Sequence, residues 1–84
     1  MLDIKVLGSG CANCKRLEQL AKKATAELGA EAKIIKVTDP TTYVDYGVLS
    51  TPGLVINGKT VSSGRVPSLA EITSYVTTAL AESE

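Results

Sequence analysis

Two cysteines separated by two residues, Cys11 and Cys14 in the stretch GSGCANCK, are the only cysteines of this 84-residue chain. Thiols at this spacing can form a disulfide with each other, hold a soft metal ion, or exchange electrons with another disulfide. The chain has no histidine, so the commonest general base and a common metal ligand are missing. Its chemistry therefore depends on what surrounds this one pair.

Metal binding and redox exchange compete for the pair. A structural zinc site needs four nitrogen or sulfur ligands, so two thiolates would have to be completed by carboxylates or a second chain. A copper-carrying module also places Cys-X-X-Cys where a strand turns into a helix, but it usually has a methionine at the position of Ser9. We favour dithiol–disulfide exchange and keep a copper- or zinc-binding module without redox turnover as the alternative.

Composition narrows the possible partners and the compartment. Nine basic and nine acidic residues balance, and no long run of one sign predicts nucleic-acid binding. The stretch MLDIKVL lacks the basic start and long apolar run that are typical of an export signal, and no apolar run in the sequence is long enough to span a membrane. A secreted domain of this size would usually carry four or more cysteines. We therefore expect one monomeric, cytoplasmic domain over residues 1–84, with no nucleic-acid or membrane partner.

The first half of the sequence predicts a strand, a helix and a second strand. Residues 2–7 alternate apolar and polar side chains and stop at a Gly-Ser-Gly turn. From Cys11 to residue 28, apolar residues recur every three or four positions, and Gly29 supplies a helix stop. Residues 32–37 are short and rich in β-branched side chains. This order predicts a right-handed βαβ unit, with the cysteines on the first helical turn.

The second half adds a short helix, a hairpin and a final helix. Asp39 and Pro40 are an N-cap and first-turn signal for a helix reaching about Tyr46. Asn57-Gly58 between two β-rich runs indicates a two-residue hairpin, and residues 68–71 form a capping box before an amphipathic helix. The predicted order is β-α-β-α-β-β-α.

The predicted position of Cys11 has a chemical consequence. A helix N-terminus presents unpaired N–H groups and the positive end of the helix dipole, so we expect a lowered pKa for the Cys11 thiol. Thiolate is the nucleophile in disulfide exchange. Cys14, one turn further on, is expected to face the interior, while Lys15 is expected to lie at the surface.

Pro52 stands immediately before an apolar strand in the stretch YGVLSTPGLVINGK. One interpretation is a proline tolerated at the first residue of a strand. The other is a cis Thr51–Pro52 bond that turns the chain tightly beside the cysteines and exposes backbone groups to an extended substrate. The sequence does not assign the isomer.

The combination of these motifs resembles the thioredoxin superfamily over nearly the whole chain. Its parts are the Cys-X-X-Cys pair after the first strand, the stretch Tyr46-Gly47-Val48, Pro52 with the hairpin, and the final helix. More narrowly, GSGCANC with STPGLVINGK and SGRVPS is similar to the compact prokaryotic proteins called small redox-active disulfide proteins.

This resemblance implies an α/β fold, a four-stranded mixed sheet with helices on both faces, and a thiol–disulfide oxidoreductase without a bound cofactor. It makes Cys11 the nucleophile, Cys14 the resolving thiol, Thr51 and Pro52 a cis-proline loop, and Gly64 a residue that leaves room for substrate backbone. The implied partners are proteins with disulfides and a thioredoxin-reductase-like or other thiol reductant.

Several positions depart from the superfamily pattern. Ala12-Asn13 replaces the Gly-Pro of thioredoxins, and Lys5 stands where they have a buried aspartate. We expect Tyr43 and Tyr46 to cover the core, and Arg65 to be a solvated loop residue.

Overall fold

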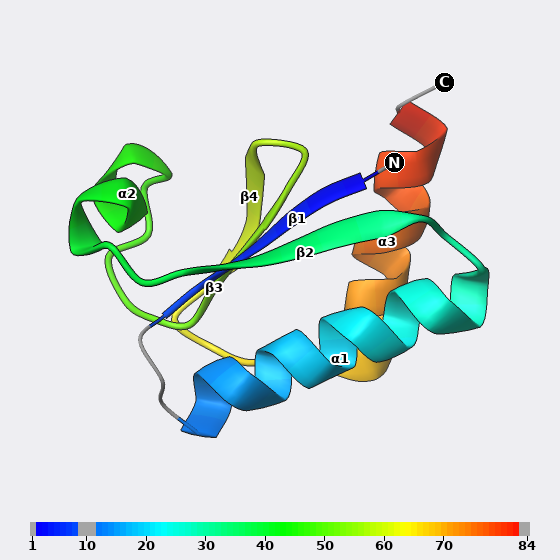
Figure 1. Ribbon diagram of the computed structural model, residues 1–84, viewed down its shortest axis with the longest axis horizontal. Coiled ribbons are helices and arrows are strands. Elements are labelled where there is room, and N and C mark those ends of the chain that lie inside the picture. The colour runs from blue at the N-terminus through cyan, green and yellow to red at the C-terminus, as the bar shows by residue number, and fades with distance from the viewer. Residues whose placement is uncertain (1, 9–11, 83–84) are drawn as a thin grey trace.

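The computed structural model describes residues 2–8 and 12–82, and contains seven elements within them (Figure 1). In chain order they are β1 (Leu2–Leu7), α1 (Ala12–Leu28), β2 (Ala32–Val37), α2 (Pro40–Asp45), β3 (Gly53–Ile56), β4 (Lys59–Ser63) and α3 (Leu69–Glu82). The predicted β-α-β-α-β-β-α order is therefore confirmed.

The four strands form one mixed sheet in the order β2-β1-β3-β4. β1 pairs in parallel with β2, and antiparallel with β3. β3 in turn pairs antiparallel with β4. The parallel pair is joined through α1, as a βαβ unit requires, so the strand nearest the cysteine segment lies inside the sheet.

Alternation along β1 divides the apolar side chains between two cores. Leu2, Ile4 and Val6 are buried in the larger core, to which α1 and α3 contribute side chains. Leu7 belongs to a smaller core on the opposite face, where side chains next to and within α2 pack. The helices thus cover both faces, with α2 apart from α1 and α3 in Figure 1, and this confirms the predicted architecture.

The β3–β4 hairpin turns at Asn57 and Gly58, as predicted. Both residues have positive φ, 52° and 80°, a conformation that glycine and asparagine adopt most readily and that suits a two-residue hairpin. The register pairs Val55 with Thr60 but Leu54 with Ser62, so β4 carries one extra residue there. This bulge increases the local twist of the strand pair.

The predicted helix starts are also confirmed. The Asp39 side chain accepts a hydrogen bond from the Thr41 N–H at 3.0 Å, and Pro40 occupies the first turn of α2. At α3, the Ser68 hydroxyl accepts from the Glu71 N–H at 3.2 Å, while the Glu71 carboxylate accepts from the Ser68 N–H at 3.3 Å.

Within residues 2–8 and 12–82, no helix combines the length and apolar character needed to cross a membrane.

Candidate active site around Cys14

Cys14 lies on the first turn of α1 and is almost completely buried, with 5% of its surface exposed. Cys11, the predicted nucleophile, lies outside the described residues, as do Ser9 and Gly10 of the predicted turn. The structure therefore describes the interior member of the pair and the residues that enclose it.

Gly8, directly after β1, lies against the Cys14 side chain. A Cβ atom at Gly8 would overlap the Cys14 Sγ and would lie 3.1 Å from the Cys14 Cβ. The Gly8 N–H donates to the Val37 carbonyl at 2.9 Å, which extends the β1–β2 pairing to the site. The missing side chain thus makes space for the Cys14 sulfur, a role that the sequence analysis did not assign to Gly8.

The Thr51–Pro52 loop reaches the same point from the other half of the chain. The Cβ position at Gly8 is 3.8 Å from the Thr51 Cβ. Thr51 is exposed, Pro52 is buried, and the peptide bond between them is cis. Cys14 and Thr51 are far apart in sequence, and both approach the Cβ position of Gly8.

Gly64 connects the end of β4 to this loop. Its N–H donates to the Pro52 carbonyl at 2.9 Å, and its φ is 76°. A Cβ at Gly64 would lie 3.2 Å from the Ser50 Cβ, closer than most side-chain contacts. The structure thus brings Thr51, Pro52 and Gly64 together, three of the residues that the resemblance selected.

A cavity of about 190 Å³ lies beside Cys14 and is lined by Val6, Gly8, Cys14, Lys15, Lys36 and Thr38. Lys15 is exposed, as predicted. The Lys36 Nζ lies 3.4 Å from a Glu18 carboxylate oxygen, so α1 and β2 are linked by an ion pair at this side. Both charged side chains that line the cavity are thus lysines.

Lys5, on β1, is held by two partners. Its Nζ donates to the Tyr46 hydroxyl at 3.1 Å and to Asp3 Oδ2 at 3.4 Å. The Tyr46 hydrogen bond is the main cause of the raised pKa of Lys5, with Asp3 adding to it. Tyr43 and Tyr46 pack on the smaller core, as predicted.

Arg65 is an exposed loop residue, as predicted, and it also has an ion-pair partner. About half of its side chain is exposed, but the guanidinium forms an ion pair with Glu71, at 2.6 Å from Nη2 to Oε2. The sequence analysis missed this pair because the two residues belong to different elements.

The described part of the chain holds no cluster of three or more histidine, cysteine, aspartate or glutamate side chains suited to a metal ion. Cys11, the other sulfur that a copper or zinc ion could bind, lies outside those residues.

Comparison with known proteins gives the family. A family model described as "Thioredoxin domain" matches residues 2–77. The chain is 39% identical over 72 residues to a thioredoxin of Methanothermobacter thermautotrophicus, covering 86% of this chain and 94% of that protein. It is also 39% identical to a thioredoxin of Methanocaldococcus jannaschii, covering 86% of this chain and 83% of that one.

The fold is likewise similar to the crystal structure of chloroplastic thioredoxin z, with a TM-score of 0.70 at 17% identity. That match covers 96% of this chain and 80% of the other. The matching family model and the two archaeal relatives, together with this fold, define a protein of the thioredoxin class. The chain belongs to the thioredoxin family and is a thiol–disulfide oxidoreductase.

Proposed function

We propose that the chain reduces or exchanges disulfides in proteins through Cys11 and Cys14, with Thr51, Pro52 and Gly64 binding the substrate. The observation that carries the proposal is the meeting of Cys14 and Thr51 at Gly8. Disulfide exchange with an extended substrate requires a sulfur atom close to an exposed loop backbone. The buried Cys14 sulfur and the exposed Thr51 loop meet this requirement. Residues 1–84 would act as one monomeric domain in the cytoplasm.

The exchange takes place in two displacements. The Cys11 thiolate attacks one sulfur of the substrate disulfide, the substrate S–S bond breaks, and the departing substrate thiolate takes up a proton. Cys14, after losing its proton, attacks the Cys11 sulfur in the mixed disulfide and releases the second substrate thiol. Two electrons have then passed to the substrate, and Cys11 and Cys14 are joined by a disulfide.

A second dithiol returns the protein to its starting state by the same exchange in reverse. We assign this step to a thioredoxin-reductase-like enzyme or another thiol reductant, because members of the family are reduced in this way. No bound cofactor is required, since each step transfers electrons only between sulfur atoms.

The loop around Thr51 offers backbone groups to an extended substrate segment. Thr51 and Gly64 are exposed on neighbouring loops. Pro52 is buried, and its carbonyl accepts a hydrogen bond from the Gly64 N–H. An extended peptide gains affinity from main-chain hydrogen bonds at such an edge. The substrate is therefore expected to lie along Thr51, with its disulfide towards the cysteine pair.

The proposal is tested by trapping. Purified Cys14→Ser protein, mixed with a disulfide-bonded protein such as insulin, is expected to accumulate a mixed disulfide visible by mass spectrometry. Cys11→Ser is expected to form no adduct and to reduce no insulin. Normal turnover by Cys14→Ser would contradict the two-cysteine mechanism.

The metal-binding alternative is tested on the unmodified chain. Protein purified without added metal is analysed for bound metal and titrated with dithiothreitol redox buffers. A reversible two-electron change in a metal-free monomer supports the proposal. Stoichiometric copper or zinc, with thiols that stay reduced throughout, would overturn it.

A further inference from the structure

The connection between β4 and α3 borders the proposed substrate loop. It begins at Gly64, whose N–H is bonded to the Pro52 carbonyl at 2.9 Å. It ends at Ser68, the residue that caps α3. Any movement of this connection therefore changes the position of Gly64 relative to Pro52.

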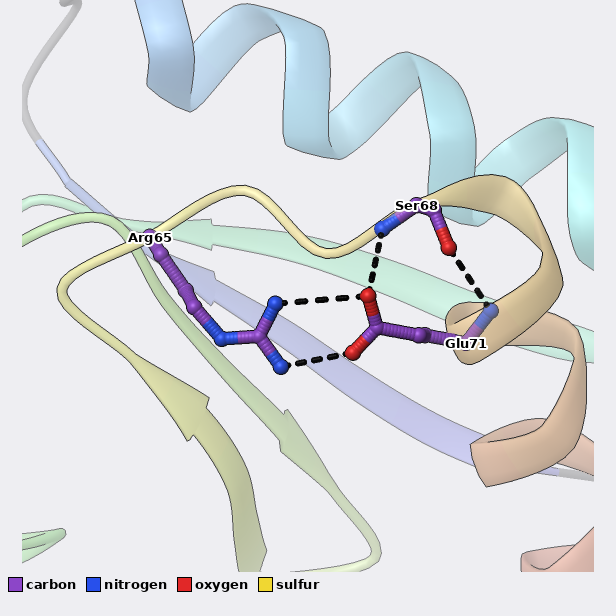
Figure 2. A network of polar contacts seen from close by, with 3 residues as sticks. All are labelled: Arg65, Ser68 and Glu71. Carbon is purple, nitrogen blue, oxygen red and sulfur yellow. Dashed lines mark hydrogen bonds and ion pairs between the residues drawn. The ribbon is translucent and has the colours of Figure 1, made fainter.

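Arg65, the residue after Gly64, is attached to the first turn of α3 (Figure 2). Its Nη2 lies 2.6 Å from Glu71 Oε2 and its Nη1 lies 3.4 Å from Oε1. This two-point contact fixes the direction of the guanidinium as well as its distance, which a single-atom contact cannot do. The Arg65 backbone, and Gly64 beside it, are thereby linked to the helix.

Glu71 is itself held by the helix that carries it. The same carboxylate accepts from the Ser68 N–H at 3.3 Å in the capping box. The hydrogen bond to Arg65 is the main cause of a Glu71 pKa lowered to about 2. The carboxylate is therefore charged at neutral pH and already oriented towards Arg65.

We propose that Arg65 is a positioning residue: paired with Glu71, it holds Gly64 against the Pro52 carbonyl and sets the spacing at which a protein substrate binds along Thr51. This inference rests on the proposed function of the Thr51–Pro52 loop. A small disulfide reacts at the cysteines without lying along that loop, so its reaction does not depend on the pair.

The test compares Arg65→Gln and Glu71→Gln with the unmodified chain. Glutamine at position 71 keeps the capping box, because its amide oxygen still accepts from the Ser68 N–H, but removes the charge that Arg65 needs. Glu27→Gln is the matched control, because it makes the same change at an exposed glutamate of α1 that does not line the cavity beside Cys14. Each variant is assayed with insulin and with bis(2-hydroxyethyl) disulfide as the small substrate.

Both Arg65→Gln and Glu71→Gln are expected to raise KM for insulin by about two- to fivefold, the range expected for an exposed ion pair. The kcat for insulin and both constants for the small disulfide are expected to stay unchanged. The double variant is expected to be no worse than either single one, because the two residues act as a unit. Glu27→Gln is expected to match the unmodified chain.

Three results would overturn the proposal. Unchanged KM for insulin in both variants would show that the pair does not position the loop. A raised KM in Arg65→Gln alone would show that Arg65 contacts the substrate itself. Equal losses on both substrates would indicate general damage to the fold. If the unmodified chain reduces neither disulfide, the proposed function fails before the pair is tested.

Discussion

The Lys5 Nζ donates a hydrogen bond to the Tyr46 hydroxyl at 3.1 Å, joining β1 to the residue that ends α2. The same ammonium group lies 5.5 Å from the centre of the Tyr46 ring. The charge of Lys5 is thus held by the Tyr46 phenol and by Asp3.

Tyr46→Phe is expected to lower the Lys5 pKa, because it removes the main cause of the raised value. The folded-state pKa lies above 10.5, so the stabilisation by this bond is complete below pH 10.5 and is lost as pH rises through the folded value. NMR titration of Lys5, with urea unfolding at pH 8 and at strongly alkaline pH, measures both effects. Tyr43→Phe is the control, because the Tyr43 hydroxyl has no hydrogen-bond partner among the described residues. An equal change of the Lys5 pKa in Tyr43→Phe would contradict the prediction.

Glu71→Gln is expected to flatten the acid side of the stability profile. The folded-state pKa of Glu71 is about 2, against an ordinary value of 4.5. The unfolded chain therefore binds the proton first, so the stabilisation is present above pH 4.5 and is lost as pH falls towards 2. Urea midpoints are measured from pH 2 to 6. The unmodified chain is expected to be more stable than the variant above pH 4.5, and this difference in stability is expected to disappear as the pH falls towards 2. A constant difference at every pH would show that the carboxylate charge is not involved.

Gly8→Ala is expected to destabilise the chain by about 1–3 kcal/mol, the usual cost of overpacking. The new methyl group would overlap the Cys14 sulfur. The cost should shrink when Cys14 is replaced by alanine, since the nearest atom is then gone. Urea unfolding of the four members of this mutant cycle, under one reducing condition, gives the coupling. Equal costs of Gly8→Ala in both backgrounds would place the clash elsewhere.

Leu17→Ala is expected to cost about 2–5 kcal/mol, because Leu17 is fully buried in the larger core. Leu49→Ala is a matched control with the same change in volume, since Leu49 is 92% exposed. Its effect is expected to stay within about 0.5 kcal/mol. Similar losses in the two variants, measured by urea unfolding, would contradict the assigned packing of α1.

The features that the sequence predicts best are those encoded within a few residues. The Asn57-Gly58 turn needs positive φ at two adjacent positions, and the Ser68–Glu71 capping box closes over a single helical turn. Each carries its signal in residue types at fixed spacing. The burial of Cys14 likewise follows from its position on an amphipathic helix.

The contacts that the sequence does not predict join residues from separate elements. Lys5 and Tyr46 are 41 positions apart, and Arg65 meets Glu71 across a loop and a helix start. Nothing in their spacing indicates either partner, because the path of the intervening chain decides the contact. The contact between Gly8 and Cys14 is also not indicated by the sequence. The glycine-rich stretch around Gly8 suggests only a turn, whereas in the fold the missing side chain of Gly8 leaves room for the Cys14 sulfur.

The central position of β1 has a consequence for the order in which the chain folds. Leu2 pairs with Ala32 on one side, while Ile4 pairs with Ile56 on the other. During synthesis the first pairing becomes available when β2 emerges, but the second must wait for the hairpin, more than 50 residues after the start. Such long-range pairing slows folding, because a large loop must close before any contact compensates for the lost entropy. A β1–β2 pair without the hairpin leaves the second edge of β1 unpaired, and the late β3–β4 hairpin is the segment that covers this edge.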